Sequence, residues 1–368
     1  MEFSLHAEQR AIAALAESLF AAHGSDQHVR ALAESEQTLD RPLWAKLADT
    51  GLLTLVLPES GGGAGVGMLE LGLVLQQQGR FLAAAPLWQH VLAGLALQVH
   101  AAASLRERVL PGIADGTHIA ALATELHGHV GLSARRSAAG WTLDGGLAAV
   151  LLDAAHRWLL APALTADGLR LFLLPTDLAG MRRSSGTLTD MQTICDLAFD
   201  GAQVAADSVL AAPAVAWLEP RMALCIAALQ LGVLDESLKR AARYVSERQQ
   251  FGRALGSFQA LAVRAADAYI EVELLRSAQW QLAWRLDCGL PALAAARVAR
   301  HQASQAGHLV GHTAIHFHGG VGADLTYPIH RFYLKSQALG LIGGGAEEQL
   351  ARIGRALAGA AAQDYLHE

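Results

Sequence analysis

The stretch YVSERQQFGRALGSFQ, residues 244–259, decides how the C-terminal half of the chain folds. It predicts that one helix ends near Arg248, that a glycine turn follows, and that a new helix begins near Ser257, whose hydroxyl is a good N-cap. At the helix end, Arg248 could bind a phosphate with two parallel hydrogen bonds, and Phe251 could cover an aromatic ring. The simpler interpretation is an ordinary helix corner in which Phe251 and Phe258 pack together as a staple.

Long segments rich in alanine and leucine surround this corner and predict a helical bundle. Helices are expected over residues 222–248, 259–286, 291–315 and 347–362. Short connections between long helices are typical of an antiparallel four-helix bundle. His301, His308 and His312 could share one face of the third helix, but carboxylates are scarce around them. We therefore interpret them as surface histidines, or as buried histidines bonded to the backbone, and predict no metal site.

The rest of the chain divides into a helical part and a β part. Residues 1–115 have apolar positions at intervals of three and four, as in helices. Short β-favouring segments separated by turn residues follow, over 119–123, 141–143, 158–160, 169–174 and 197–199. The predicted fold is α+β and mostly α: an N-terminal helical domain (1–115), a small antiparallel β domain (116–212) and a C-terminal four-helix bundle (213–368).

Composition excludes several classes of protein. Hydrophobic residues make up 52% of the 368 residues and charged residues 17%, which supports a large core and excludes a disordered chain. The net charge of −6 leaves no basic surface for nucleic acid. Apolar runs are interrupted before the roughly 18 residues of a membrane span, no signal peptide is visible, and the three cysteines have neither metal nor disulfide spacing. We therefore expect a soluble cytoplasmic protein.

Two glycine-rich segments differ in what they predict. PESGGGAGVG, residues 58–67, lacks the Gly-Lys-Ser/Thr ending of a phosphate loop and follows no strong strand, so a turn between helices is the better interpretation. AIHFHGGVGADLTYPIHR, residues 314–331, places a double glycine at the end of a helix, where the backbone can approach a ligand closely. Taken alone, the second segment is only a glycine C-cap.

Together, the segments 244–259 and 314–331 resemble the acyl-CoA dehydrogenase family. The resemblance runs the full length, because residues 43–65, the pair Thr124-Glu125 and the hairpin residues 141–145 also match family patterns. It implies a helical domain, a β-barrel-like domain and a four-helix bundle. It also implies FAD as cofactor and an acyl-CoA as substrate, oxidised to the 2,3-enoyl-CoA. A carboxylate removes the α-proton while hydride passes from the β-carbon to the flavin.

The family binds FAD at a subunit interface, and the resemblance assigns parts of that site to residues of this chain. Arg248 and Phe251 are implied to meet the diphosphate and adenine-ribose side of a neighbour's FAD, with Gln259 beside them. The segment 316–320 takes the family's Gln-x-x-Gly-Gly position on the adenine side. The residues assigned to the cofactor in this way are Arg248, Phe251, Gln259, His316, Gly319, Gly320, Thr124 and Glu125, the last two lying by the isoalloxazine of the chain's own site.

The catalytic base of the family has no clear counterpart. Its usual position falls on Gly343, or on Gly344 after a shift of one residue, and the alternative position falls on Met222. Glu219 is the first choice for a displaced base if the chain acts alone, although the proline after it suggests a helix start, where a carboxylate is commonly just a favourable charge. Absence of any base in this chain is the alternative.

Smaller departures from the family pattern concern the same sites. Leu126 replaces a proline, His316 replaces a glutamine, and the Trp-x-Thr segment that cradles the flavin in many members is not recognisable within 150–158. Glu347 and Glu348 are further candidates for a base, but they lie on the far side of the glycine segment.

This pattern resembles the short, divergent subunits that work as pairs on bulky acyl-CoAs, such as steroid side-chain and pimeloyl-type substrates. Three hypotheses follow. The first is an FAD-dependent acyl-CoA dehydrogenase subunit, in a homo-oligomer or hetero-oligomer assembled through the C-terminal bundle, with electron-transfer flavoprotein as acceptor. The second is a catalytically silent subunit that completes a partner's FAD site. The third is a relative with other flavin chemistry, an oxidase or monooxygenase.

Overall fold

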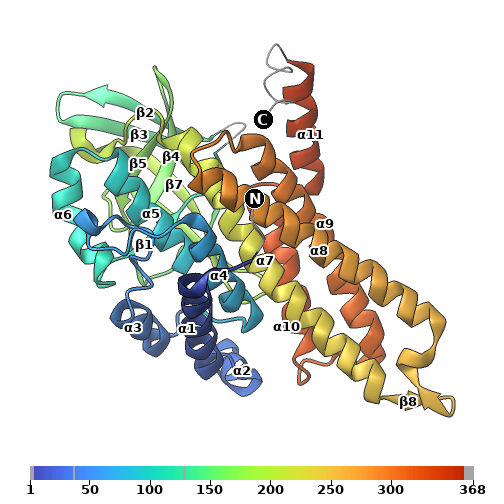
Figure 1. Cartoon of the computed structure of the whole chain (residues 1–368). Helices are drawn as coiled ribbons and strands as arrows, with labels where there is room; N and C mark the ends of the chain where they lie inside the picture. The colour runs from blue at the N-terminus through green and yellow to red at the C-terminus, as the bar shows by residue number, and fades with distance from the viewer. Residues whose placement is uncertain (1–3, 36–37, 127–129, 360–368) are drawn as a thin grey trace. The chain divides into compact units, whose positions relative to one another are not determined.

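The computed structural model describes residues 4–35, 38–126 and 130–359, and contacts divide the chain into two compact units. The first unit takes in the residues up to Ala31, the segment Gly67–Ala83 and the chain from Ala223 on. The second takes in Leu32–Val66 and Ala84–Met222. Both units are drawn in Figure 1. Because these units interleave along the sequence, the division into three consecutive domains stays a prediction.

The second unit is built around a sheet with helices from the preceding segments. Its helices are α3 (Arg41–Asp49), η1 (Glu59–Gly61), α5 (Leu87–His100), α6 (Ala103–Ala114) and η2 (Ala206–Ser208). Its strands are β1 (Ile119–Leu122), β2 (Leu132–Ser137), β3 (Gly140–Val150), β4 (His156–Thr165), β5 (Gly168–Pro175), β6 (Met181–Thr187) and β7 (Thr193–Val204). Helix α5 packs against β1.

The sheet has the order β1-β4-β2-β3-β7-β6, with β5 also paired to β4. It is mostly antiparallel, as expected, but β1 pairs parallel with β4, and Ser133 of β2 pairs parallel with Leu164 of β4. The β2–β3 hairpin lies between β1 and β4 in sequence, which makes the connection long enough for a parallel pair. The core of the unit contains Leu143, Leu159 and Phe172, all fully buried.

Strands β2 and β6 were not among the predicted segments. Their sequences, LSARRS and MRRSSGT, are polar, and β6 is exposed along almost its whole length. Strand β6 is an edge strand and buries too little apolar surface to give an alternating pattern. Strand β2 lies inside the sheet between β4 and β3, but of its side chains only Leu132 and Ala134 are buried.

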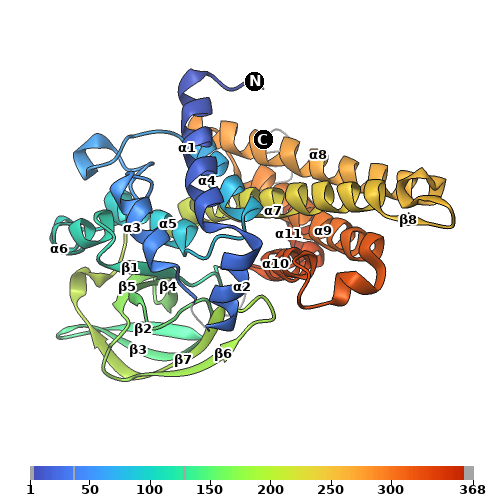
Figure 2. The ribbon, with the colours of Figure 1, turned by 90° about the horizontal axis from the view of Figure 1, so that it is seen from below.

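The first unit is a bundle of long helices. Its elements are α1 (Ala7–His23), α2 (Asp26–Glu34, whose end crosses the boundary), α4 (Met68–Arg80), α7 (Ala214–Glu247, most of which belongs here), β8 (Gln249–Gln250), β9 (Arg253–Ala254), η3 (Leu255–Ser257), α8 (Gln259–Asp287), α9 (Leu293–His318), η4 (Gly319–Ala323), α10 (Ile329–Leu341) and α11 (Ala346–Ala358). Figure 2 shows α7 and α8 running side by side to the β8–β9 hairpin. Helix α11 lies close to the predicted 347–362 helix and packs on α9, and α10, which also packs along α9, was not predicted.

Helix α7 is long and apolar enough to cross a membrane by length and composition. However, 78% of its most apolar window is buried inside the protein, so it is a core helix. Its contact with α4 depends on glycine: a Cβ at Gly79 would collide with the Leu229 carbonyl, and one at Gly232 with the Gln76 carbonyl. The two backbones therefore approach each other more closely than larger residues allow.

Candidate functional site

The corner at residues 248–254 is a two-stranded hairpin instead of a plain glycine turn. Arg248 follows α7 directly and is exposed, and β8 pairs antiparallel with β9. The two turn residues, Phe251 and Gly252, have φ of 57° and 79°. Two successive left-handed residues are the mark of a type I′ turn, for which asparagine and glycine are the favoured pair. The Phe251 side chain is 88% exposed.

The predicted N-cap of the next helix is wrong. Ser257 belongs to η3, and its hydroxyl donates to the Ala254 carbonyl at 2.7 Å, so Phe258 is the N-cap residue of α8, without a side-chain cap bond. The predicted contact of Phe251 with Phe258 is present, edge-to-face with ring centroids 6.1 Å apart. Arg253 adds a guanidinium 3.9 Å above the Phe258 ring. Gln259 is exposed in the first turn of α8.

The structure brings the two sequence motifs together through stacked aromatic rings. Tyr244 of the first motif stacks on His318 of the second, with centroids 4.3 Å apart and 28° between planes. Tyr327 lies 5.2 Å from His318 and 6.3 Å from Tyr244. Burial lowers the pKa of His318, whose Nδ1 contacts the Ala314 carbonyl at 2.7 Å, so the ring packs as a neutral aromatic.

The double glycine ends α9 as predicted. Helix α9 stops at His318, and Gly319 follows with a φ of 58° and donates its N–H to the His316 carbonyl. A Cβ at Gly319 or Gly320 would meet no atom within 4 Å, so the backbone is open here. His316 is exposed one turn before the glycines. An open, exposed backbone beside exposed polar side chains can accept a ligand.

Neither predicted base position carries a carboxylate, and the first is a tightly held loop. Gly343 and Gly344 have φ of 68° and 100° and connect α10 to α11. Arg300, 4% exposed on α9, donates through Nη2 to the Ile342 carbonyl at 2.6 Å and contacts those of Leu339, Gly340 and Gly344 at 3.4 Å. Burial, followed by repulsion from Arg352, lowers the pKa of Arg300 to about 10.

Glu347 and Glu348 both lie in the first turn of α11. Glu348 pairs with Arg352 at 2.9 Å and with Arg355 at 3.2 Å. The hydrogen bond from Arg352 lowers the Glu348 pKa. Both carboxylates are favourable charges at the start of α11, and Glu348 is in addition an ion-pair partner of Arg352 and Arg355.

The second base position lies on the N-terminal part of α7. Met222 is 6% exposed and Glu219 is 9% exposed. The expectation that Pro220 marks a helix start is wrong, because α7 begins at Ala214 and Pro220 lies inside it. Glu219 is therefore a buried carboxylate within a helix, one turn before Met222.

The Thr124-Glu125 pair follows the end of β1, where the Leu126 N–H donates to the Thr124 carbonyl at 2.9 Å. Burial raises the pKa of Glu125, and the charge of nearby Asp196 adds to this. Asp196 also accepts the Ala149 N–H at 2.9 Å, and Ala149 has a φ of 55°. Sequence reasoning missed Ala149 because nothing in an alanine signals a left-handed backbone.

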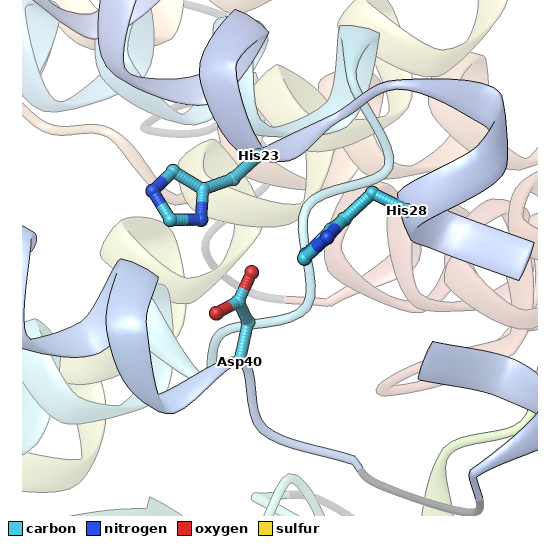
Figure 3. A group of neighbouring side chains, drawn as sticks. All are labelled: His23, His28 and Asp40. Carbon is cyan, nitrogen blue, oxygen red and sulfur yellow. The ribbon is translucent and has the colours of Figure 1, made fainter. Parts of the chain in front are cut away.

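Three other side chains have structural roles within their own units (Figure 3). His23, at the end of α1, and His28, on α2, contact edge-to-face at 5.9 Å. Asp40 belongs to the second unit and caps α3 by accepting the Leu43 N–H at 3.0 Å. We assign no metal to them, because the histidines and Asp40 belong to different units.

Comparison with known proteins places this geometry in one family. The chain matches the family models "Acyl-CoA dehydrogenase, N-terminal domain" over residues 6–117 and "Acyl-CoA dehydrogenase, C-terminal domain" over residues 220–358. It is 36% identical to acyl-CoA dehydrogenase FadE27 of Mycobacterium tuberculosis over 371 residues, which cover 97% of this chain and 99% of the relative.

Two solved structures are similar over nearly the whole chain. The ChsE4-ChsE5 complex from Mycobacterium tuberculosis contains a chain with a TM-score of 0.92 and 36% identity, covering 97% of this chain and 99% of that one. A variant of the Tcur3481-Tcur3483 steroid ACAD contains one with a TM-score of 0.91 and 36% identity, covering 96% and 99%. The predicted fold class, mostly helical α+β, is confirmed by these matches. With the order of helices, sheet and bundle described above, they show that the chain belongs to the acyl-CoA dehydrogenase family.

Proposed function

We propose that this chain is one subunit of a heteromeric acyl-CoA dehydrogenase that oxidises an acyl-CoA to the 2,3-enoyl-CoA. In this assembly the chain completes the FAD site of its partner through Arg248 and Phe251, and the partner supplies the catalytic base. FAD held by these residues would supply the hydride acceptor for the oxidation. A bulky, steroid-type acyl group, electron-transfer flavoprotein as electron acceptor and a cytoplasmic location belong to the same proposal.

The observation that carries the proposal is the conformation of Phe251. A left-handed backbone costs a residue with a side chain roughly 1–2 kcal/mol. The 88% exposed ring recovers little of that cost by burial in the single chain. Strained residues of this kind persist where a ligand or partner uses them. The hairpin is thus built to present an aromatic ring outward rather than to stabilise the chain that carries it.

The neighbouring groups fit a dinucleotide. The exposed Arg248 guanidinium has a planar set of donors that suits a diphosphate. Gly319 and Gly320 leave the backbone open to close approach, His316 is exposed three residues before them, and Gln259 is exposed at the start of α8. We assign Thr124 and Glu125 to the isoalloxazine side of the chain's own site. Burial, followed by repulsion from Asp196, raises the pKa of Glu125 at this position.

Removal of an α-proton requires a base within hydrogen-bond reach of the α-carbon. Glycine and methionine at Gly343, Gly344 and Met222 cannot accept a proton, so the base has to come from elsewhere. A partner subunit is the simplest source. The 36% identical relatives belong to the two-component assemblies ChsE4-ChsE5 and Tcur3481-Tcur3483, which supports this choice. Glu219 is the second candidate and applies if the chain is active by itself.

The test compares Phe251→Asn with a matched control, Met191→Asn. Met191 has a φ of 68° and is 45% exposed, so asparagine relieves the same kind of backbone strain away from the hairpin. We expect both variants to raise the melting temperature of the chain by about 1 °C, since about 1 kcal/mol is gained by a chain of this length. Only Phe251→Asn should lower the flavin absorbance of the complex co-purified with an acyl-CoA dehydrogenase paralogue. Equal flavin content in both complexes would contradict the proposed role of the hairpin.

A further inference from the structure

One part of the sequence has a charge balance opposite to that of the whole chain. Residues 293–341, which form α9 and α10, contain four lysines and arginines, six histidines and a single acid, Asp324. The whole chain carries a net charge of −6. Segregation of one sign of charge onto two adjacent helices creates a local field that attracts the opposite sign.

Three of these histidines form a row on the exposed face of α9. His308, His312 and His316 follow one another at intervals of four residues, and all three are exposed. Spacings of four place side chains on one face of a helix. The row spans roughly 12 Å along the axis. It is continuous in sequence with the open backbone at Gly319.

Contacts from two neighbouring helices fix the middle of the row. The rings of His308 and His312 lie 4.4 Å apart, and the Tyr333 hydroxyl of α10 lies 3.4 Å from His312 Nε2. On α8, Arg264 donates to the Thr313 hydroxyl at 3.4 Å, beside His312 in the sequence. These contacts hold His308 and His312 beside α10 and α8, and His316 continues the row one turn further along α9.

The electrostatics of the row favour an anion. Partial burial lowers the pKa of His312, and the positive charges of His308 and Arg264 lower it further. These two groups, with Tyr333, are the titratable side chains that the structure shows facing His312 from α9, α8 and α10. A bound anion would offset this repulsion and draw protons onto the imidazoles. A divalent cation, by contrast, would meet the charge of Arg264.

We propose that the row formed by His308, His312 and His316, with Arg264, binds the phosphate groups of a nucleotide diphosphate and takes up protons as it does so. A ligand with several phosphate contacts suits a row of this length better than a single phosphate does. The inference rests on the proposed function in one respect: His316 belongs to the surface assigned to a partner's FAD. His308 and His312 extend that surface by two helical turns.

The experiment measures binding of inorganic pyrophosphate and of ADP to the full chain by calorimetry, at about pH 6 and about pH 8. We expect binding about three- to sixfold tighter at the lower pH, which corresponds to one histidine whose pKa rises by about one unit on binding. The double variant His308→Gln/His312→Gln should lose this pH dependence. The matched control is His301→Gln/His330→Gln, because both of these histidines contact backbone carbonyls, of Ala346 and Tyr327.

Equal binding of pyrophosphate at both pH values, or an unchanged pH dependence in the double variant, would overturn the inference. So would tight Zn²⁺ binding by the parent chain without any pyrophosphate binding. Unchanged helical circular dichroism in both double variants shows that they fold. The flavin content of the co-purified complex tests the proposed function separately: a parent chain that forms no flavin complex contradicts that function, whatever the pyrophosphate titration shows.

Discussion

Replacement of His90 by glutamine should flatten the dependence of stability on pH. His90 lies on α5 and is completely buried. Its Nε2 lies 2.9 Å from the Ile113 carbonyl, and its Nδ1 accepts the Ala120 N–H at 3.3 Å. These partners require one protonated and one unprotonated nitrogen, so the ring is neutral. The Trp44 ring contacts it edge-to-face at 4.8 Å.

The magnitude follows from the pKa of this ring. Burial lowers the His90 pKa from 6.5 to about 4, against the hydrogen bond to Ile113 and with a smaller contribution from His156. Between these two values the unfolded chain binds a proton that the folded chain excludes. The free energy of unfolding is therefore not reduced by His90 above pH 6.5, and it falls through this group as the pH is lowered from 6.5 toward 4. At about 1.36 kcal/mol per pH unit, the loss from this group is about 3 kcal/mol.

The assay is urea unfolding at about pH 7 and about pH 4.5, followed by tryptophan fluorescence. Trp44 reports on this part of the chain because it touches the histidine ring. His90→Gln keeps one donor and one acceptor but does not titrate, so its unfolding free energy should fall by about 2–3 kcal/mol less than that of the parent over this range. Equal losses in the parent and in His90→Gln would refute the reasoning.

Three further predictions concern the site. Arg248→Ala should weaken FAD retention by the complex by about one to two orders of magnitude without unfolding the chain, because a charge-assisted contact contributes roughly 1.5–3 kcal/mol; equilibrium dialysis of the flavin checks this. Glu219→Gln should leave anaerobic flavin reduction by acyl-CoA unchanged if the base comes from the partner, whereas a loss of several orders of magnitude with FAD still bound would make Glu219 the base. Gly344→Glu should lower the melting temperature and restore no activity to the chain alone, because the position has a φ of 100° and a Cβ there would meet the Glu348 Cγ at 2.9 Å; dehydrogenase activity of this variant would contradict the assigned loop geometry.

Periodicity and turn residues predicted much of the fold. The end of α7, both ends of α8 and the end of α9 at a double glycine lie close to their predicted bounds, whereas α7 begins eight residues before the predicted start at 222. Helix α10, whose N-cap residue is Pro328, was not predicted from the sequence. Short-range patterns cannot show which strands pair, so the parallel pairing of β1 with β4 was also missed.

The candidate site was less predictable, because its features depend on backbone conformation and on contacts distant in sequence. Nothing in the sequence around Phe251 indicates that its backbone is left-handed, a conformation for which asparagine is the favoured residue at this turn position. The stacking of Tyr244 on His318 joins segments more than seventy residues apart. Resemblance to a family identified both segments, but only the fold shows that they meet.

The loop held by Arg300 has an evolutionary consequence. The arginine binds backbone carbonyl oxygens, so it supports any sequence that can follow the same backbone path. Because that path is left-handed at Gly343 and Gly344, few residues other than glycine can replace them. A substitution that places a carboxylate at Gly344 would bring its Cβ against the Glu348 side chain and would force a residue with a side chain into a left-handed backbone conformation. Regaining a base here therefore takes several coordinated substitutions, each unfavourable alone. Under the proposed function, a lineage with such a loop depends on its partner for the base, and the two genes are expected to be kept or lost together.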